Sequence, residues 1–232
     1  MTSCPTEWGT VADWAVALST LIVAIVAVGQ EWIRGLWVHP TLKIEASTRP
    51  PNCVLVPVTN SSTGEFIANR IYLRIRVENS GNRAAKNTEV YASALRRLRG
   101  DGSWEPLSSF PPMNLRWADL GTLYWPVLAA KVSKYCDVAH ITDPSRRHLV
   151  GEDVNRLGPT AYQTNMVFDL ITAPNHNGHV VGPGTYQLDV LVAAENASPH
   201  KTTVQIFLEG KWENDEALML RDAVGITVLP KS

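Results

Sequence analysis

Histidine and aspartate residues gather in one stretch of the chain, and their types suit a metal ion. His140, Asp143 and His148 fall at the end of an expected strand and in the loop after it. Three such ligands on zinc would activate water for hydrolysis. Their spacing matches no helical zinc motif, and successive strand residues point to opposite faces. We expect no metal site, here or at His176 and His179, and keep a metal-dependent hydrolase using the first three residues as an alternative.

Arginine and tryptophan residues provide a second set of candidate binding groups. The guanidinium group of arginine donates paired hydrogen bonds to phosphate or carboxylate groups, and the indole ring of tryptophan gives a large contact area at interfaces. Several of these residues fall at a strand end or outside clear strands, within or beside the region 100–165. Packing of the rings over the ends of the sandwich, and a solvated strand end for the arginines, are the interpretations that we favour, with a binding face as the other. The candidate binding surface consists of Arg96, Arg97, Trp104, Trp117 and Trp125.

Motifs for catalysis and cofactor binding are missing from the sequence. It contains no glycine-rich phosphate loop, nucleophile elbow or paired metal-binding cysteines. We therefore predict no catalytic residues and no cofactor. The formal net charge of −1 gives no electrostatic basis for binding nucleic acid. Three cysteines are too few for a disulfide framework in 232 residues, so Cys53 and Cys136 are either reduced core thiols, which we favour, or a pair.

An apolar segment near the start of the chain predicts a transmembrane helix. No charged residue occurs from Trp14 to Gly29, and this length is close to that needed to cross a bilayer. Trp8 and Trp14 precede the segment, while Trp32 and Trp37 follow it, which is typical of aromatic belts at the two interfaces. A buried core helix and a cleaved signal peptide are the alternatives. The residues expected in lipid are Trp14, Leu18, Leu21, Ile22, Ile25, Val28 and Trp32.

The basic residues that flank this helix predict its orientation, and small residues on one of its faces suggest a partner helix. No Lys or Arg precedes the helix, whereas Arg34, Lys43 and Arg49 follow it within about twenty residues. This bias favours an outside N-terminus and a soluble domain in the cytoplasm. Small residues share one helix face and would let a second helix approach closely. Self-association through this face is one interpretation, and the general abundance of alanine is the other. The face carries Ala17, Thr20, Ala24 and Ala27.

Beyond His39-Pro40 the periodicity changes to the alternation of β-strands. Residues 71–78 alternate apolar and polar side chains, the asparagine-glycine turn 79–82 follows, and residues 88–98 form a second strand. Further strands are expected at 42–46, 54–58, 135–141, 166–171, 186–192, 204–208 and 225–229. Eight or nine strands without a strong second helix indicate an antiparallel sandwich or barrel. The domains are then 1–38, a transmembrane helix and neck, and 39–232, a β-sandwich.

Two segments resemble bacterial immunoglobulin-like adhesion modules of the CARDB-like type. VENSGNRAAKNTEVY (77–91) resembles their strand–turn–strand unit, and GPGTYQLDVLVAAENA (182–197) is similar to their late strand. The resemblance implies an immunoglobulin-like sandwich that binds or scaffolds rather than catalyses. Region 100–165 has no counterpart in such modules, which are usually extracellular.

These features predict a single-pass protein of the cell membrane that acts as a noncatalytic binding module. Its expected partners are the lipid bilayer and either a protein partner or a second copy bound through the helix, with no nucleic acid. Region 100–165 would then be the recognition surface. A membrane effector or sensor, whose helices cluster when the cytoplasmic domain binds a ligand, is the second hypothesis.

Overall fold

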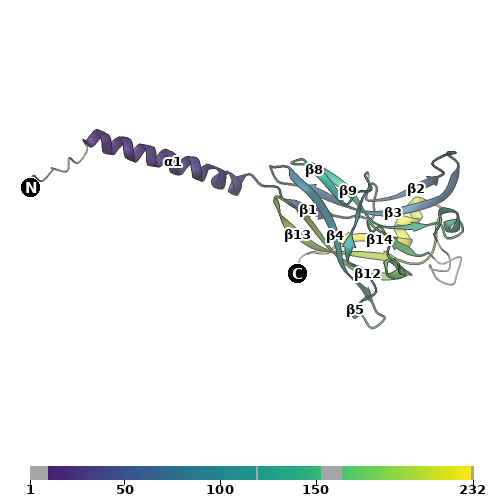
Figure 1. Ribbon diagram of the computed structural model, residues 1–232. Coiled ribbons are helices and arrows are strands. Elements are labelled where there is room, and N and C mark those ends of the chain that lie inside the picture. Colours follow the sequence, from purple (N-terminus) through teal and green to yellow (C-terminus); the bar gives the residue numbers. More distant parts are fainter. Residues whose placement is uncertain (1–9, 119, 153–163, 231–232) are drawn as a thin grey trace, which may run out of the picture. The chain divides into compact units, whose positions relative to one another are not determined.

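The computed structural model describes residues 10–118, 120–152 and 164–230, and the side chains of residues 31–37 lie outside the described part. The chain divides into two compact units, residues 1–39 and 40–232. The first contains one long helix and the second contains all fourteen described strands. A mainly β fold preceded by one apolar helix is therefore confirmed (Figure 1).

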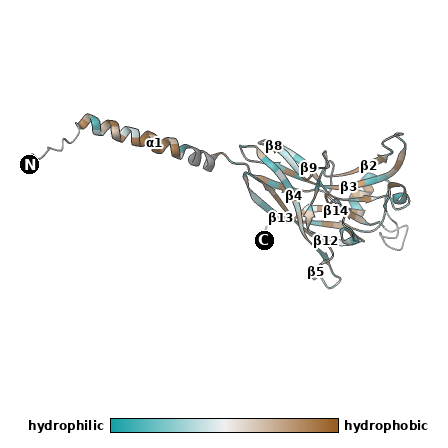
Figure 2. Cartoon of the chain, viewed as in Figure 1, coloured by the Kyte–Doolittle hydropathy of each residue, from teal (hydrophilic) through white to brown (hydrophobic). Residues whose placement is uncertain are grey.

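Helix α1 (Val11–Trp37) begins at a capping box. The Thr10 hydroxyl accepts a hydrogen bond from the Asp13 amide, and the Asp13 carboxylate accepts one from the Thr10 amide at 2.7 Å. The helix ends before His39-Pro40, as predicted. Residues Val11–Gln30 are long and apolar enough to span a membrane, and none of this stretch is buried against protein (Figure 2).

Sheet A contains seven antiparallel strands built around β3. This long strand alternates buried aliphatic and half-exposed polar residues, as its period of two requires. The strand order is β1-β3-β9-β10-β11, with β2 also on β3 and β7 also on β9. Its strands are β1 (Leu42–Glu45), β2 (Cys53–Thr59), β3 (Phe66–Asn79), β7 (Arg116–Trp117), β9 (Ser133–Thr142), β10 (Met166–Phe168) and β11 (Val180–Val181).

Sheet B contains the other seven strands, in the order β14-β13-β12-β4-β5, with β6 and β8 also paired to β4. Its strands are β4 (Ala85–Leu98), β5 (Trp104–Pro106), β6 (Met113–Asn114), β8 (Tyr124–Leu128), β12 (Gly184–Ala194), β13 (Ala197–Leu208) and β14 (Val224–Val228). Short helical turns connect them: η1 (Arg147–Val150), η2 (Asn177–His179), α2 (Glu216–Leu218) and the π-helical η3 (Met219–Ala223).

The two sheets enclose one apolar core. Inward residues of β3 and β9 from sheet A and of β4, β12 and β13 from sheet B belong to the same buried cluster. Region 100–165 is not an appendage to this sandwich, because it supplies the central strand β9 and the short strands β5 to β8. The role of region 100–165 as a recognition surface stays a prediction. Part of that region, 153–163, lies outside the described residues.

One end of the sandwich, here called the neck end, receives the chain from α1. It comprises Thr41, the loop 80–84, strand β8 and the loop 129–132, all held by Asn79. The fully buried Asn79 side chain accepts from the amides of Thr41 and Gly81, both at 3.1 Å. It donates to the carbonyls of Arg83 and Leu128 at 2.7 and 3.0 Å. A single side chain thus joins the start of the domain to the loop 80–84 and to strand β8, and the Asn79 backbone bonds to the loop 129–132.

Candidate functional site

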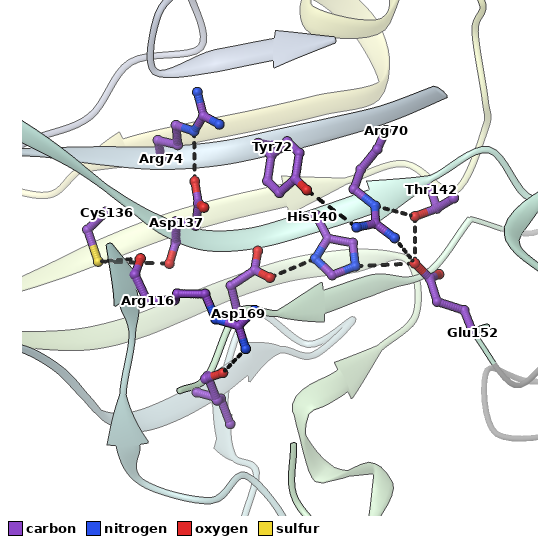
Figure 3. Close-up of polar contacts among 11 residues, drawn as sticks. Arg70, Tyr72, Arg74, Arg116, Cys136, Asp137, His140, Thr142, Glu152 and Asp169 are labelled. Carbon is purple, nitrogen blue, oxygen red and sulfur yellow. Dashed lines mark hydrogen bonds and ion pairs between the residues drawn. The ribbon is translucent and has the colours of Figure 1, made fainter. Parts of the chain in front are cut away.

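A buried ionic network lies on the outer face of sheet A, across strands β3 and β9 (Figure 3). Asp137 and His140 both face outward although they are three residues apart. Such spacing would normally put them on opposite faces, but a β-bulge at Val138 shifts the register so that Arg74 pairs with Asp137 and Tyr72 with His140. The bulge therefore assembles the network.

His140 is held between two carboxylates. Its Nδ1 lies 2.9 Å from Asp169 Oδ1 and its Nε2 lies 3.3 Å from Glu152 Oε1. Burial by itself would lower the pKa of His140, but the charge and hydrogen bond of Asp169 and the hydrogen bond to Glu152 raise this pKa to about 8. A pKa of about 8 favours the imidazolium form at neutral pH, in which both ring nitrogens donate to the carboxylates.

Glu152 accepts three hydrogen bonds on one oxygen. Arg70 Nη2 donates at 2.6 Å, the Thr142 hydroxyl at 2.7 Å and His140 Nε2 at 3.3 Å. Thr142 in turn accepts from Arg70 Nε at 2.9 Å. Burial opposes ionisation of Glu152, but the hydrogen bonds from His140 and Thr142 and the charge of Arg70 outweigh it, so the pKa of Glu152 falls below its ordinary value. These contacts fix the segment after η1 on the sheet.

A second ion pair and one aromatic ring complete the network. Arg74 Nε donates to Asp137 Oδ1 at 2.7 Å. Burial raises the pKa of Asp137 despite the charge of Arg74. The Tyr72 ring lies between cations, 5.1 Å from Arg74 Cζ and 5.9 Å from Arg70 Cζ. Three cations therefore face three anions: Arg70, Arg74 and His140 against Asp137, Glu152 and Asp169.

The arrangement suits a structural cross-link better than a reaction centre. A general base or a metal-binding histidine needs a free lone pair, whereas both nitrogens of His140 face carboxylates. Arg70 and Arg74 are each engaged by a carboxylate at 2.6 or 2.7 Å. The network ties β3, β9, the residue after β10 and the segment after η1 into one layer.

The His140 geometry predicts a loss of stability at alkaline pH. A folded pKa of about 8 against an ordinary 6.5 stabilises the fold fully below pH 6.5, and this contribution disappears as the pH rises through 8. The free energy of unfolding should fall by about 2 kcal/mol between pH 6 and pH 9. Thermal unfolding of the full chain in detergent, followed by near-UV circular dichroism, measures this difference. His140→Gln should flatten the profile and exposed His148→Gln should not; a parent profile already flat over this range would contradict the assignment.

The three residues of the metal-dependent alternative, His140, Asp143 and His148, make separate contacts. Asp143 accepts from the amide and hydroxyl of Ser145 at 2.9 and 2.7 Å, and so stabilises a turn, while His148 is exposed on η1. Among the described residues, no group of three or more His, Cys, Asp or Glu side chains is arranged to hold a metal ion. His140 takes its partners from Glu152 and Asp169 instead.

The second histidine pair lies in η2 beside a shallow pocket. His176 Nδ1 accepts from the Gly178 amide at 3.1 Å, and His179 Nδ1 lies 3.2 Å from the His176 carbonyl. A side chain on Gly178 would place its Cβ 1.7 Å from the Ser109 carbonyl oxygen, so the loop packs closely on that backbone. The pocket beside η2 has a volume of about 690 Å³ and is lined by residues 108–112 and 176–178. A second pocket, of about 530 Å³, is lined by loop residues 143–145, 209–212 and 214. Both pockets are open to solvent.

The candidate binding surface does not form one patch. Trp117 is fully buried and meets Trp125 edge-on at 5.7 Å between ring centroids, so its assignment to a surface is wrong. A large ring closing the core explains its position. Arg96 donates to Asp189 at 2.6 Å on the outer face of sheet B, and Arg97 donates to the Pro183 carbonyl at 3.0 Å. Trp104 is half-buried on the edge strand β5.

Most residues expected in lipid are exposed on α1. Their exposed fractions run from 53% for Ile22 to 82% for Val28, and include Trp14, Leu18, Leu21 and Ile25. The Trp32 side chain lies outside the described residues. The small residues Ala17, Thr20, Ala24 and Ala27 lie on one continuous helix. The Thr20 hydroxyl donates to the Val16 carbonyl at 2.8 Å, so its donor is satisfied within α1.

The thiols in the core are reduced and unreactive. Cys53 and Cys136 are both free and buried, which confirms the favoured interpretation. Burial raises the pKa of Cys53 to about 12, and a protonated thiol is a poor nucleophile. Cys4 lies outside the described residues.

Comparison with known proteins leaves the family open. No protein-family model matches the chain, and no curated protein matches it. The similarity of 77–91 and 182–197 to CARDB-like modules therefore remains a prediction. What the structure establishes is a mainly β unit of two antiparallel sheets, preceded by one helix that is long and apolar enough to span a membrane.

Proposed function

We propose that this protein is a single-pass membrane-anchored binding module, without catalytic activity, whose β-sandwich lies in the cytoplasm. The observation that carries the proposal is the exposed apolar surface of α1 over Val11–Gln30. A soluble protein rarely exposes a contiguous apolar surface of this size, and a bilayer would cover it. The sandwich of residues 40–232 has its own core and does not need α1 for burial.

The cytoplasmic orientation and the noncatalytic role have separate support. Arg34, Lys43 and Arg49 follow the span closely and no Lys or Arg precedes it, as expected when the side after the span stays in the cytoplasm. Buried free thiols suit a reducing compartment. The noncatalytic role is supported by the network around His140, in which both ring nitrogens already have partners.

Membrane extraction tests the anchor. The full chain is expected to stay in the membrane pellet after a wash with alkaline carbonate, whereas a chain with Ile22→Arg and Ile25→Arg should appear in the supernatant. Each arginine at the centre of a span costs about 3 kcal/mol for insertion. Leu218→Arg, at an exposed position of the sandwich, is the matched control and should leave the protein in the pellet.

Two results of this experiment would reject parts of the proposal. Release of the unaltered chain by carbonate, or recovery of a shortened chain that lacks α1, would remove the anchor. Protease added outside intact cells should leave the sandwich uncut until the membrane is permeabilised. Digestion of the sandwich in intact cells would reverse the assigned orientation while leaving the anchor in place.

A further inference from the structure

We propose that the neck end of the sandwich docks on anionic lipid headgroups. The inference rests on the proposed anchor, and it adds a second membrane contact made by the β unit itself. The neck end is the part of the domain held to Thr41 by Asn79.

Chain length keeps the neck end close to the bilayer. Residues 31–37 continue α1 beyond the apolar span and add about 10 Å at helical rise. Residues 38–40, if fully extended, add about another 10 Å before Thr41. Thr41 is bonded to Asn79 and Ser80. A surface tethered within about 20 Å of a membrane has a high effective concentration toward it, so weak contacts are sufficient for docking.

The exposed charges at the neck end are mainly positive. Lys131 contacts the Ser80 carbonyl. Arg83 lies in the same loop 80–84, and Lys86 lies at the start of β4 opposite Val127 of β8. Lys43 lies two residues after Thr41, on β1 opposite Glu78. All four cations are exposed. Each basic residue near an anionic membrane surface adds to the attraction toward it.

Three carboxylates lie near these cations, but two of them are less exposed to solvent than the cations are. Glu78 and Glu89 are half-buried, and Glu89 accepts from Asn114 at 3.0 Å. Glu195 is exposed and accepts from the Asn87 side chain at 2.6 Å. At the described neck end and the adjoining parts of β1, β3, β4 and the loop after β12, these four exposed cations accompany one exposed carboxylate. Exposed Glu45, farther along β1, is paired with Arg76 at 3.1 Å.

Apolar and aromatic side chains accompany these cations on strand β8 and the adjoining loop. Val127 pairs across the strands with Lys86, so the two share a face. Val127, Tyr124 and Val132 are 57%, 44% and 39% exposed. Pro126 lies in this edge strand, and proline has no amide hydrogen to offer a further strand. Exposed apolar and aromatic groups among cations fit an interface with lipid headgroups. Because Pro126 cannot donate a hydrogen bond, the edge of β8 disfavours pairing with a strand of another protein.

The test uses the full chain in vesicles, with Cys4→Ser and one fluorescent label at Val127→Cys or, as a control, at Ser61→Cys. Ser61 lies in the turn before Phe66, at the far end of β3 from Asn79, about 40 Å away at strand rise. A nitroxide on the lipid headgroup quenches labels that approach the surface. Vesicles of phosphatidylcholine alone are compared with vesicles containing phosphatidylserine.

Quenching at residue 127 should rise at least twofold with phosphatidylserine, fall again at high salt, and stay unchanged at residue 61. Charge reversal at Arg83, Lys86 and Lys131 should abolish the rise. The same charge change at Arg99, Lys211 and Arg221 should not. A rise that survives the first variant, or no rise at all in protein that floats with vesicles, would overturn the docking surface. Protein that fails to float with vesicles would instead overturn the anchor.

Discussion

Replacing Glu152 with alanine is expected to lower the free energy of unfolding of the sandwich by about 3 kcal/mol, because buried cations would lose their shared anion. Glu152 Oε1 accepts from Arg70, Thr142 and His140 at 2.6 to 3.3 Å, and its side chain is only 16% exposed. Chemical denaturation of the full chain in detergent, followed by near-UV circular dichroism, measures the change.

Two comparisons separate this ionic effect from loss of a surface contact. Glu105→Ala removes the partner of exposed Arg99 and should cost far less stability than Glu152→Ala, because water screens an exposed ion pair. The double substitution Arg70→Met with Glu152→Leu should destabilise less than Glu152→Ala alone, because no charge is then left buried without its partner. Equal losses from Glu152→Ala and Glu105→Ala would show that the network is not a stabilising cross-link.

The sandwich could be predicted from sequence because its long strands carry a strong local signal. Residues 71–78 alternate so regularly that the register of β3 follows from them, and the outward positions of Tyr72 and Arg74 follow with it. The short strands β5 to β8 have two to five residues and include prolines, so they show no such periodicity. Their pairing with β4 and β9 depends on tertiary contacts that no local pattern encodes.

The ionic network could be predicted only in part. Arg70 and Arg74 follow from the alternation, but the outward direction of both Asp137 and His140 depends on the bulge at Val138. The partners of His140 are 12 and 29 residues away in the chain. Proximity in sequence therefore suggested Asp143 and His148, whereas the fold selects Glu152 and Asp169.

Trp117 illustrates the same limit for the core. Its segment lacks an alternating pattern, and a tryptophan beside charged residues is compatible with either a surface or a buried position. Two-residue strand β7 pairs Trp117 with Cys136 and turns the indole inward. A composition-based surface assignment could not anticipate a strand this short.

Asn79→Ala is expected to destabilise the sandwich by about 4 kcal/mol, the largest effect of a single substitution considered for this chain. It leaves the amides of Thr41 and Gly81 and the carbonyls of Arg83 and Leu128 without their partner. Each buried polar group left unsatisfied costs about 1 to 3 kcal/mol, and water at the domain end recovers part of the sum.

Asn79→Asp tests the direction of these bonds. Its carboxylate keeps both acceptor contacts with Thr41 and Gly81 but faces the carbonyls of Arg83 and Leu128 without a donor. The variant should therefore lose stability at pH 7 and recover part of it as the pH falls toward 4, because the buried carboxyl takes up a proton that it can donate. Asn60→Ala is the matched control, because Asn60 makes a similar turn at an exposed position, accepting from the Ser62 amide at 2.8 Å. Hydrogen exchange should show faster exchange of the amides of residues 41, 81 and 131 in Asn79→Ala alone. Unchanged protection at these amides would mean that Asn79 does not hold the neck end together, and the docking surface would then lack the rigid frame that presents its cations as one group.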